Sequence, residues 1–221
     1  MKFFLSWSTA LLTPVLLLSL ALRILLTPTF LRLEYGQASF PPDPYGFTQA
    51  ERLQWAGYAL EFIRAPHPVS YLADLTMPDG RPLFNERELR HMVDVQRVTL
   101  AARRVGDLTL GITLLLGLIA IRFRSLRAYF QGLQRGGWLT LLLTLALGLF
   151  GALAFWEFFT LFHALFFEGD TWLFEYSDTL IRLFPLRFWQ DVFAVTAIIV
   201  IAGALLLAFS PRLAHLRRTR V

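Results

Sequence analysis

Residues 154–191 read AFWEFFTLFHALFFEGDTWLFEYSDTLIRLFPLRFWQD, a stretch that starts inside one apolar segment and ends beside another. It contains far more Phe, Trp and Tyr than a connecting loop requires. Rings with an apolar body and a polar tip favour the boundary between water and hydrocarbon. His163 lies among these rings, and an ionisable side chain at membrane depth is a candidate for function. The stretch therefore predicts a chemical site at a membrane interface.

The composition outside this stretch is that of a small polytopic membrane protein. Of the 221 residues, 56% are hydrophobic and only 17% are charged, which is too apolar for an ordinary soluble domain. The chain has no cysteine. This excludes a disulfide framework, a thiolate nucleophile and a cysteine metal site.

Four long apolar segments predict the fold class, an all-α integral membrane protein with four transmembrane helices. Each segment has roughly the 18 to 25 residues that a helix needs to cross a bilayer. The segments lie at about residues 3–26, 106–123, 138–159 and 192–209. The first could be a signal peptide, but no small-x-small cleavage site follows it, so a retained helix is expected. No repeat or linker divides the chain, and a single membrane domain over residues 1–221 is expected.

The distribution of charge predicts the orientation of these helices. Residues 122–135 and the tail after residue 209 carry Arg and no acid, and with Lys2 they hold nine basic residues. All 16 acidic residues lie in or beside the other two connections. By the positive-inside rule, both termini are expected in the cytoplasm. The basic net charge then reflects topology, and no nucleic-acid partner is expected.

The two outer connections, residues 27–105 and 160–191, predict an extracellular and mainly helical cap. Thr48 and Glu51 form a capping-box pattern, which predicts the start of one helix. We expect this helix to end before Pro66. Asn85 with Glu88 predicts a second start, for a helix from Glu86 to about Arg103.

Two of the four histidines are the best candidates for chemistry. On the second cap helix, His91 has Glu88 and Asp94 nearby, and either carboxylate would orient the imidazole and raise its basicity. His163 is the other candidate, because a continuous helix counted from Trp138 would bring it to the outer interface. We expect His67, in a rigid proline turn, and His215, in the basic tail, to be surface residues.

Other chemistries have little support in the sequence. There is no Gly-x-Ser-x-Gly elbow, P-loop, dinucleotide fingerprint or HExxH motif. The histidines and acids show no tight ligand spacing, so neither a metal site nor a cofactor is expected.

Three stretches make the chain resemble the lipoprotein intramolecular transacylase family of small integral membrane proteins. They are PPDPYGF at residues 41–47 with Arg52, ELRHMVDV at residues 88–95, and Phe162-His163 followed by Trp172, Asp178, Leu180-Ile181, Phe184-Pro185 and Trp189. The resemblance covers nearly the whole chain, including the helix pattern.

The resemblance implies an acyl shift at the outer face of the bacterial cell membrane. The substrate would be a lipoprotein whose N-terminal cysteine carries a diacylglyceryl group. The sn-2 acyl chain would move to the α-amino group of that cysteine and leave a lyso-form lipoprotein. His91 and His163 match the positions of the family's two functional histidines. Partners would be these lipoproteins and membrane lipids, and a monomer is expected.

Two imidazoles suit this reaction, since aminolysis of an ester needs a base, an acid for the departing alkoxide and donors for the oxyanion. Because Asp94 would support His91, the sequence favours His91 as base and His163 as acid or oxyanion donor. Candidate pocket walls are Trp172, Tyr176, Phe184 and Trp189.

Two other functions stay open at this point. One is a non-catalytic lipid- or lipoprotein-binding membrane protein with structural histidines. The other is a hydrolase or metal-assisted transferase that acts on lipids. Histidines that face one aromatic site would favour the transacylase, and histidines that point apart would favour the binding protein. A metal between the histidines would favour the hydrolase or metal-assisted transferase. A transporter is disfavoured because no charge lies deep in the apolar segments.

Overall fold

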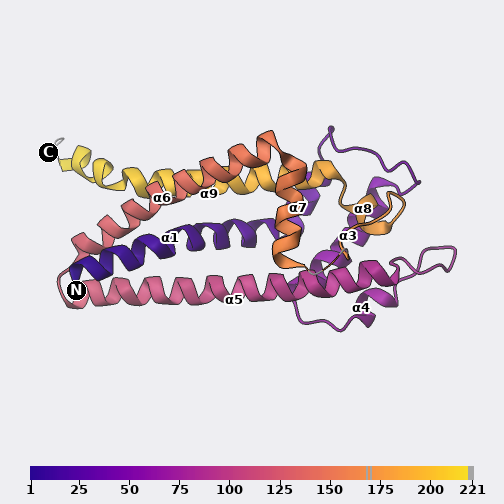
Figure 1. Cartoon of the computed structure of the whole chain (residues 1–221), viewed down its shortest axis with the longest axis horizontal. Helices are drawn as coiled ribbons and strands as arrows, with labels where there is room; N and C mark the ends of the chain where they lie inside the picture. Colours follow the sequence, from indigo (N-terminus) through magenta and orange to yellow (C-terminus); the bar gives the residue numbers. More distant parts are fainter. Residues whose placement is uncertain (168, 170, 219–221) are drawn as a thin grey trace. The chain divides into compact units, whose positions relative to one another are not determined.

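A computed structural model describes residues 1–167, 169 and 171–218, with side chains up to Ser210. The described residues form helices and turns, with one isolated bridge between Thr76 and Pro82 and no strand, so the all-α prediction is confirmed for them. Figure 1 traces the helices in order. Their bounds are α1 Lys2–Leu25, α2 Pro28–Tyr35, α3 Gln49–Arg64, α4 Ser70–Ala73, α5 Glu86–Arg122, α6 Leu126–Leu153, α7 Phe155–Phe166, α8 Thr179–Leu183 and α9 Leu186–Arg218.

Helices α1, α5, α6 and α9 are long and apolar enough to cross a membrane. The four predicted apolar segments fall mainly on these helices, but the third, at residues 138–159, runs past the end of α6 into α7. Helices α6 and α9 also begin earlier than the apolar runs at residues 138 and 192. Residues 126–137, with two arginines and three glycines, extend the start of α6, whereas the residues that extend α9 before position 192 include Phe188, Trp189 and Asp191. The extracellular placement of the cap stays a prediction.

The predicted end of a helix near Arg103 is wrong, since α5 runs unbroken for 37 residues. Gly106, where the second apolar segment was predicted to begin, allows two helices to approach. A Cβ added there would lie 1.8 Å from the Ser19 hydroxyl oxygen on α1. Glycine in a helix interior costs only about 1 kcal/mol, so close packing overrides it as a break signal.

The predicted helix from Trp138 through Phe159 to His163 is also interrupted. Helix α6 ends at Leu153, and Ala154 leaves the helical region with φ −142° and ψ 64° before α7 begins. The residues beside Ala154 include no proline, so the sequence carries no local signal for this break. Aromatic residues dominate α7. Because they lose rotamer freedom in a helix, they favour helix formation less than the residues of α6 do.

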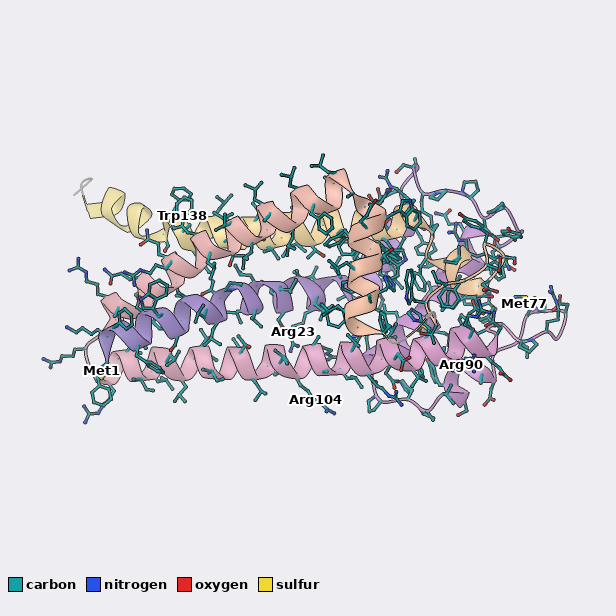
Figure 2. The ribbon with its side chains drawn as sticks, viewed as in Figure 1. Met1, Arg23, Met77, Arg90, Arg104 and Trp138 are labelled. Carbon is teal, nitrogen blue, oxygen red and sulfur yellow. The ribbon has the colours of Figure 1, made fainter. Side chains whose placement is uncertain are left out.

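The chain divides into two compact units. The first, called here the bundle unit, comprises Met1–Leu22, Arg103–Phe155 and Val195–Val221. Small residues let its helices approach closely, as is common in membranes. A Cβ on Gly132 would lie 2.5 Å from the Ser6 carbonyl oxygen, and one on Gly137 would lie 2.7 Å from the Ala204 carbonyl oxygen. In Figure 2, carbon dominates the side chains along these long helices.

The second, called here the head unit, comprises Arg23–Ala102 and Trp156–Ala194. Its core contains Phe62, Leu72, Leu83 and Leu183, all at most 1% exposed. The predicted capping box is confirmed, because the Thr48 hydroxyl accepts from the Glu51 N–H and Glu51 accepts from the Thr48 N–H.

A set of hydrogen bonds fixes the short helix α8 within the head unit. Buried Glu88 accepts from the N–H groups of both Asn85 and Leu180, at 2.7 and 2.6 Å. The Thr179 hydroxyl donates to the Leu83 carbonyl at 2.5 Å, and the Tyr35 hydroxyl donates to the Leu183 carbonyl at 2.5 Å. A helix of five residues is not stable on its own, so these hydrogen bonds from other elements fix its position.

Candidate active site

The imidazoles of His91 and His163 face each other in the head unit. Their ring centroids are 6.3 Å apart, and the rings are nearly parallel at 19°. His91 comes from α5 and His163 from α7, and both are nearly buried, at 9% and 7% exposed. Two histidines distant in sequence therefore form one site rather than pointing apart.

A main-chain hydrogen bond sets the tautomer of His163. Its Nδ1 lies 2.7 Å from the carbonyl oxygen of Phe159, one turn earlier in α7. A carbonyl oxygen only accepts, so Nδ1 must carry the proton. In the neutral ring, Nε2 then holds the free lone pair. This arrangement makes Nε2 a proton acceptor at an orientation that the helix itself fixes.

Burial lowers the pKa of His163 below its usual 6.5, although the bond to the Phe159 carbonyl opposes this shift. Charging an imidazole out of water is unfavourable. His163 is therefore neutral at physiological pH, and its Nε2 is available as a base.

His91 has one ring nitrogen with no partner among the residues that the structure describes. Its Nδ1 is buried and makes no hydrogen bond to any described residue. Phe167 and Phe174 hold the ring edge-on, with centroids at 4.9 and 5.3 Å. Buried polar atoms are rarely left unpaired. An imidazole clamped by aromatic rings with a free nitrogen is poised to bond a ligand.

The two carboxylates expected to orient His91 have other partners. Asp94 accepts from Arg97 at 3.1 Å on the surface of the same helix. Glu88 is committed to the start of α5 and to α8, as described above. No bond from either one to His91 occurs among the described residues, so the structure gives no carboxylate support to His91.

The four aromatic residues expected to line the site have different positions. Trp172 packs against His163, with ring centroids 4.6 Å apart. Trp189 lies one layer away, 6.2 Å from Phe159 and 6.3 Å from Phe184. Tyr176 is 78% exposed. The structure thus brings Trp172 to His163, connects Trp189 to His163 through Phe159, places Phe184 behind Trp189, and leaves Tyr176 at the surface.

Three aromatic residues that surround the pair were not among the predicted pocket walls, although the sequence places all three in the aromatic stretch around His163. The Phe159 ring lies 4.1 Å from His163, in addition to the carbonyl bond. Phe167 contacts both histidines, and Phe174 contacts His91. Phe159 and His163 are four positions apart, the one-turn spacing that places neighbours on a helix face, and this spacing was the available signal.

The remaining histidines and possible metal ligands do not join this site. His67 stacks on Tyr71, with centroids 4.4 Å apart. The side chain of His215 lies outside the described residues. Within the part of the chain that the structure describes, no three His, Asp or Glu side chains converge as metal ligands.

A buried ion pair braces the same unit. Arg182 of α8 donates to Asp43 with two nitrogens, at 3.2 and 2.9 Å to Oδ2. The Asp43 side chain is fully buried, and the guanidinium carbon lies 3.6 Å from the centroid of the Phe47 ring. Burial works to raise the pKa of Asp43, but the bonds from Arg182 and from the Phe47 N–H outweigh it and lower the pKa.

Comparison with known proteins adds a family to this geometry. The profile of the family described as Lipoprotein intramolecular transacylase Lit matches residues 5–189. A relative from Aquifex aeolicus (strain VF5), described as an uncharacterized protein, is 31% identical over 197 residues, 89% of this chain and 88% of the relative.

Solved structures share the fold at lower identity. The membrane integral lipoprotein intramolecular transacylase Lit from Bacillus cereus matches with a TM-score of 0.79 at 20% identity, covering 100% of this chain and 98% of that one. A variant of that protein with one histidine replaced by arginine matches with a TM-score of 0.59, covering 100% of this chain and 94% of the variant. With the family profile matched over most of its length, this chain belongs to the lipoprotein intramolecular transacylase family and is a multi-pass membrane acyltransferase.

Proposed function

We propose that this enzyme moves the sn-2 acyl chain of a diacylglyceryl-modified lipoprotein to the α-amino group of its N-terminal cysteine. The observation that carries the proposal is the pair of buried imidazoles 6.3 Å apart. No activated serine is needed, because the nucleophile and the ester belong to one substrate. The products are an N-acylated cysteine and a free glycerol hydroxyl, so mass is conserved.

In this mechanism His163 acts as the base. The cysteine nitrogen, in its neutral form, attacks the carbonyl carbon of the ester, and a C–N bond forms. Its extra proton passes to Nε2 of His163, the acceptor that the Phe159 bond leaves free. As the ester C–O bond breaks, the imidazolium returns this proton to the glycerol oxygen. One imidazole thus supplies both the base and the acid steps.

His91 donates a hydrogen bond to the oxygen that becomes negative in the transition state. Its unpartnered Nδ1 is available for this role. A donor aimed at a developing oxyanion contributes about 10² to 10³ in rate. This assignment reverses the sequence-based preference for His91 as base, because Asp94 bonds Arg97 instead.

The aromatic surroundings favour the intramolecular reaction. Phe167 contacts both histidines, and Trp172 covers His163. Such walls exclude water, which would otherwise hydrolyse the ester, and hold the amine near the carbonyl.

The proposed setting is the bacterial cell membrane, with both termini in the cytoplasm and the histidine pair at the outer face. Its support is the distribution of basic residues along the sequence. We further propose that both units act together as one membrane domain over residues 1–221, as a monomer whose partners are lipoproteins and membrane lipids.

The test is to express the chain in a bacterium that makes only diacylglyceryl lipoproteins with free amino termini. The N-terminal peptide of a reporter lipoprotein is then fragmented by mass spectrometry, because total mass does not change. We expect the acyl group on the cysteine nitrogen with the native chain. His163→Gln, which keeps size but cannot act as a base, should abolish the shift.

Two further variants separate roles. His91→Asn, which keeps a donor near the position of Nδ1, should retain more activity than His91→Ala. His67→Gln is the matched control, since His67 stacks on Tyr71 away from the pair. Acyl chains that stay on glycerol with the native chain, despite verified membrane expression, would refute catalysis and favour the lipid-binding function.

A further inference from the structure

A basic cavity lies in the bundle unit, far along the sequence from the histidines. Its volume is about 260 Å³, slightly below the roughly 300 Å³ at which sites for drug-sized ligands begin. Four cations and no acidic residue line it. The lining comprises Lys2, Phe3, Ser6, Arg124, Ser125, Arg127, Ala128, Gln131 and Arg135. In Figure 2, blue nitrogen tips gather around the labelled Met1.

The cavity contains a buried hydroxyl with nothing to bond. Ser125 is 2% exposed, and its Oγ has no partner among the described residues. Ser125 occupies the N-cap position of α6 but makes no side-chain capping bond. A serine at this position ordinarily satisfies a free N–H of the first turn. The Ala128 N–H already bonds the Ser125 carbonyl at 2.9 Å. The Ser125 hydroxyl and the first N–H groups of the turn, those of Leu126 and Arg127, are therefore the donors that an outside ligand can meet.

The helix start favours a negative ligand on separate grounds. The first N–H groups of a helix lack intrahelical partners and carry partial positive charge, which binds phosphates and carboxylates. Arg124, immediately before this start, has a positive φ of 50°, an unusual conformation for a residue with a side chain. Backbone donors, a hydroxyl and guanidinium groups thus converge on one small space.

Part of the rim is already fixed in place. Arg135 donates to the Ser6 hydroxyl at 3.2 Å and lies over the Trp7 ring at 5.3 Å. Arg124 and Arg127 are exposed. Arginine forks match the oxygens of a phosphate group. The chemistry of the cavity is therefore that of a phosphate ester.

We propose that this cavity binds the phosphate of an anionic phospholipid headgroup. Phe3 lines the cavity and is 76% exposed, and neighbouring Phe4 is 70% exposed, so apolar surface for acyl chains adjoins the cations. Basic pockets between membrane helices on the cytoplasmic side recognise anionic headgroups in this manner. The proposal assigns a lipid site separate from the histidine pair and does not rest on the proposed function.

The experiment is lipid binding to the full chain in detergent, followed by native mass spectrometry. The probes are phosphatidylglycerol, phosphatidylcholine with the same acyl chains, and inorganic phosphate alone. We expect phosphatidylglycerol to bind more tightly than phosphatidylcholine. Arg124→Gln and Arg127→Gln should each weaken phosphatidylglycerol binding about fivefold.

Arg122→Gln is the matched control, because Arg122 has the same charge in the same connection but does not line the cavity. It should leave binding unchanged. Equal losses from Arg122→Gln and Arg124→Gln would overturn the site and leave only general surface charge. Competition by inorganic phosphate at equal concentration would overturn the lipid assignment in favour of free phosphate.

Ser125→Ala tests the hydroxyl separately from charge. It should weaken phosphatidylglycerol binding about tenfold or more, since the phosphate loses a charged hydrogen bond. Without lipid, the variant should be as stable as the native chain or more so, because the Oγ has no protein partner. Unchanged lipid binding would refute a role for Ser125 in the site.

Discussion

At the scale of single residues, the site depends on how two identical side chains receive different environments. His163 has its Nδ1 bonded to the Phe159 carbonyl, whereas the Nδ1 of His91 has no partner among the described residues. The first arrangement fixes a lone pair on Nε2, and the second leaves a nitrogen for a ligand. In the proposed mechanism, the different roles of the two rings follow from these bonds and not from the residue type.

The lowered pKa of His163 predicts the pH dependence of the acyl shift. In the proposed mechanism the neutral His163 ring is the active form, so the rate should fall when His163 gains a proton. Burial moves that loss below pH 6.5. The substrate amine, with a pKa near 8, must also be neutral. We expect a one-proton slope of log rate against pH from about 6.5 to 8, and a two-proton slope only below the pKa of His163. A two-proton slope that begins above pH 6.5 would contradict this account.

The pair Asp43–Arg182 predicts a large stability effect from one substitution. Arg182→Met leaves a buried carboxylate unpaired, which costs about 3 to 5 kcal/mol. Arg97→Met is the control, because its pair with Asp94 is exposed at 74% and 35% and contributes about 0 to 1 kcal/mol. Denaturant unfolding in detergent measures both. Similar losses for the two variants would show that the buried pair contributes no more than a surface pair.

Since the pKa of Asp43 is lowered in the folded chain, the stability that the pair contributes is present above the unfolded pKa near 3.9. It is lost as the pH falls through the folded value. The difference between the native chain and Arg182→Met should therefore shrink in acid.

At the scale of helices, close packing against α1 explains two of the glycines in α6. Gly132 and Gly136 lie one turn apart and approach α1. A Cβ on Gly136 would lie 2.4 Å from the Thr13 Cβ and 2.8 Å from the Ala10 carbonyl oxygen. Gly148 in the same helix has nothing within 4 Å. Glycines that look alike in the sequence therefore differ in the structure: Gly132 and Gly136 allow close helix packing, and Gly148 does not.

These glycines predict substitutions of opposite sign. Gly132→Ala or Gly136→Ala should destabilise the chain by about 1 to 3 kcal/mol, because backbone atoms occupy the space. Gly148→Ala should stabilise it by about 0.5 to 1 kcal/mol, since alanine has the lower entropy cost in a helix. Thermal unfolding in detergent gives the sign directly. A stabilising Gly136→Ala would mean that α1 and α6 are not in close contact.

The helices also show what the sequence does and does not reveal. Apolar length gave the four long helices, and capping patterns gave the starts of α3 and α5, because both signals are local. The break at Ala154 and the continuity of α5 through Gly106 depend on packing with distant residues. Likewise, Asp94 is three positions from both His91 and Arg97, so spacing alone could not select its partner.

At the scale of the whole molecule, topology is the property that charge predicts and that labelling can test. The chain has no cysteine, so single cysteines can be introduced without other changes. Asp79 is 51% exposed in a turn of the head unit, and Arg122 is exposed in the basic connection.

We expect Asp79→Cys to react with a membrane-impermeant maleimide on intact cells. Arg122→Cys should react only after the cells are permeabilised. This outcome would place the head unit outside and the basic connection inside. Reaction of Arg122→Cys on intact cells would reverse the proposed orientation and, with it, the assignment of the histidine pair to the outer face.

The hydrogen bond from His163 to the main chain of Phe159 has a consequence for how the enzyme tolerates genetic drift. Every amino acid at position 159 supplies the same carbonyl, so the proton on Nδ1 is insensitive to mutation there. The ring at that position is free to vary in size or polarity while the tautomer persists. Substrate preference can therefore diverge among descendants of this enzyme without loss of the basic nitrogen, and a library at position 159 would alter fit while it spares protonation.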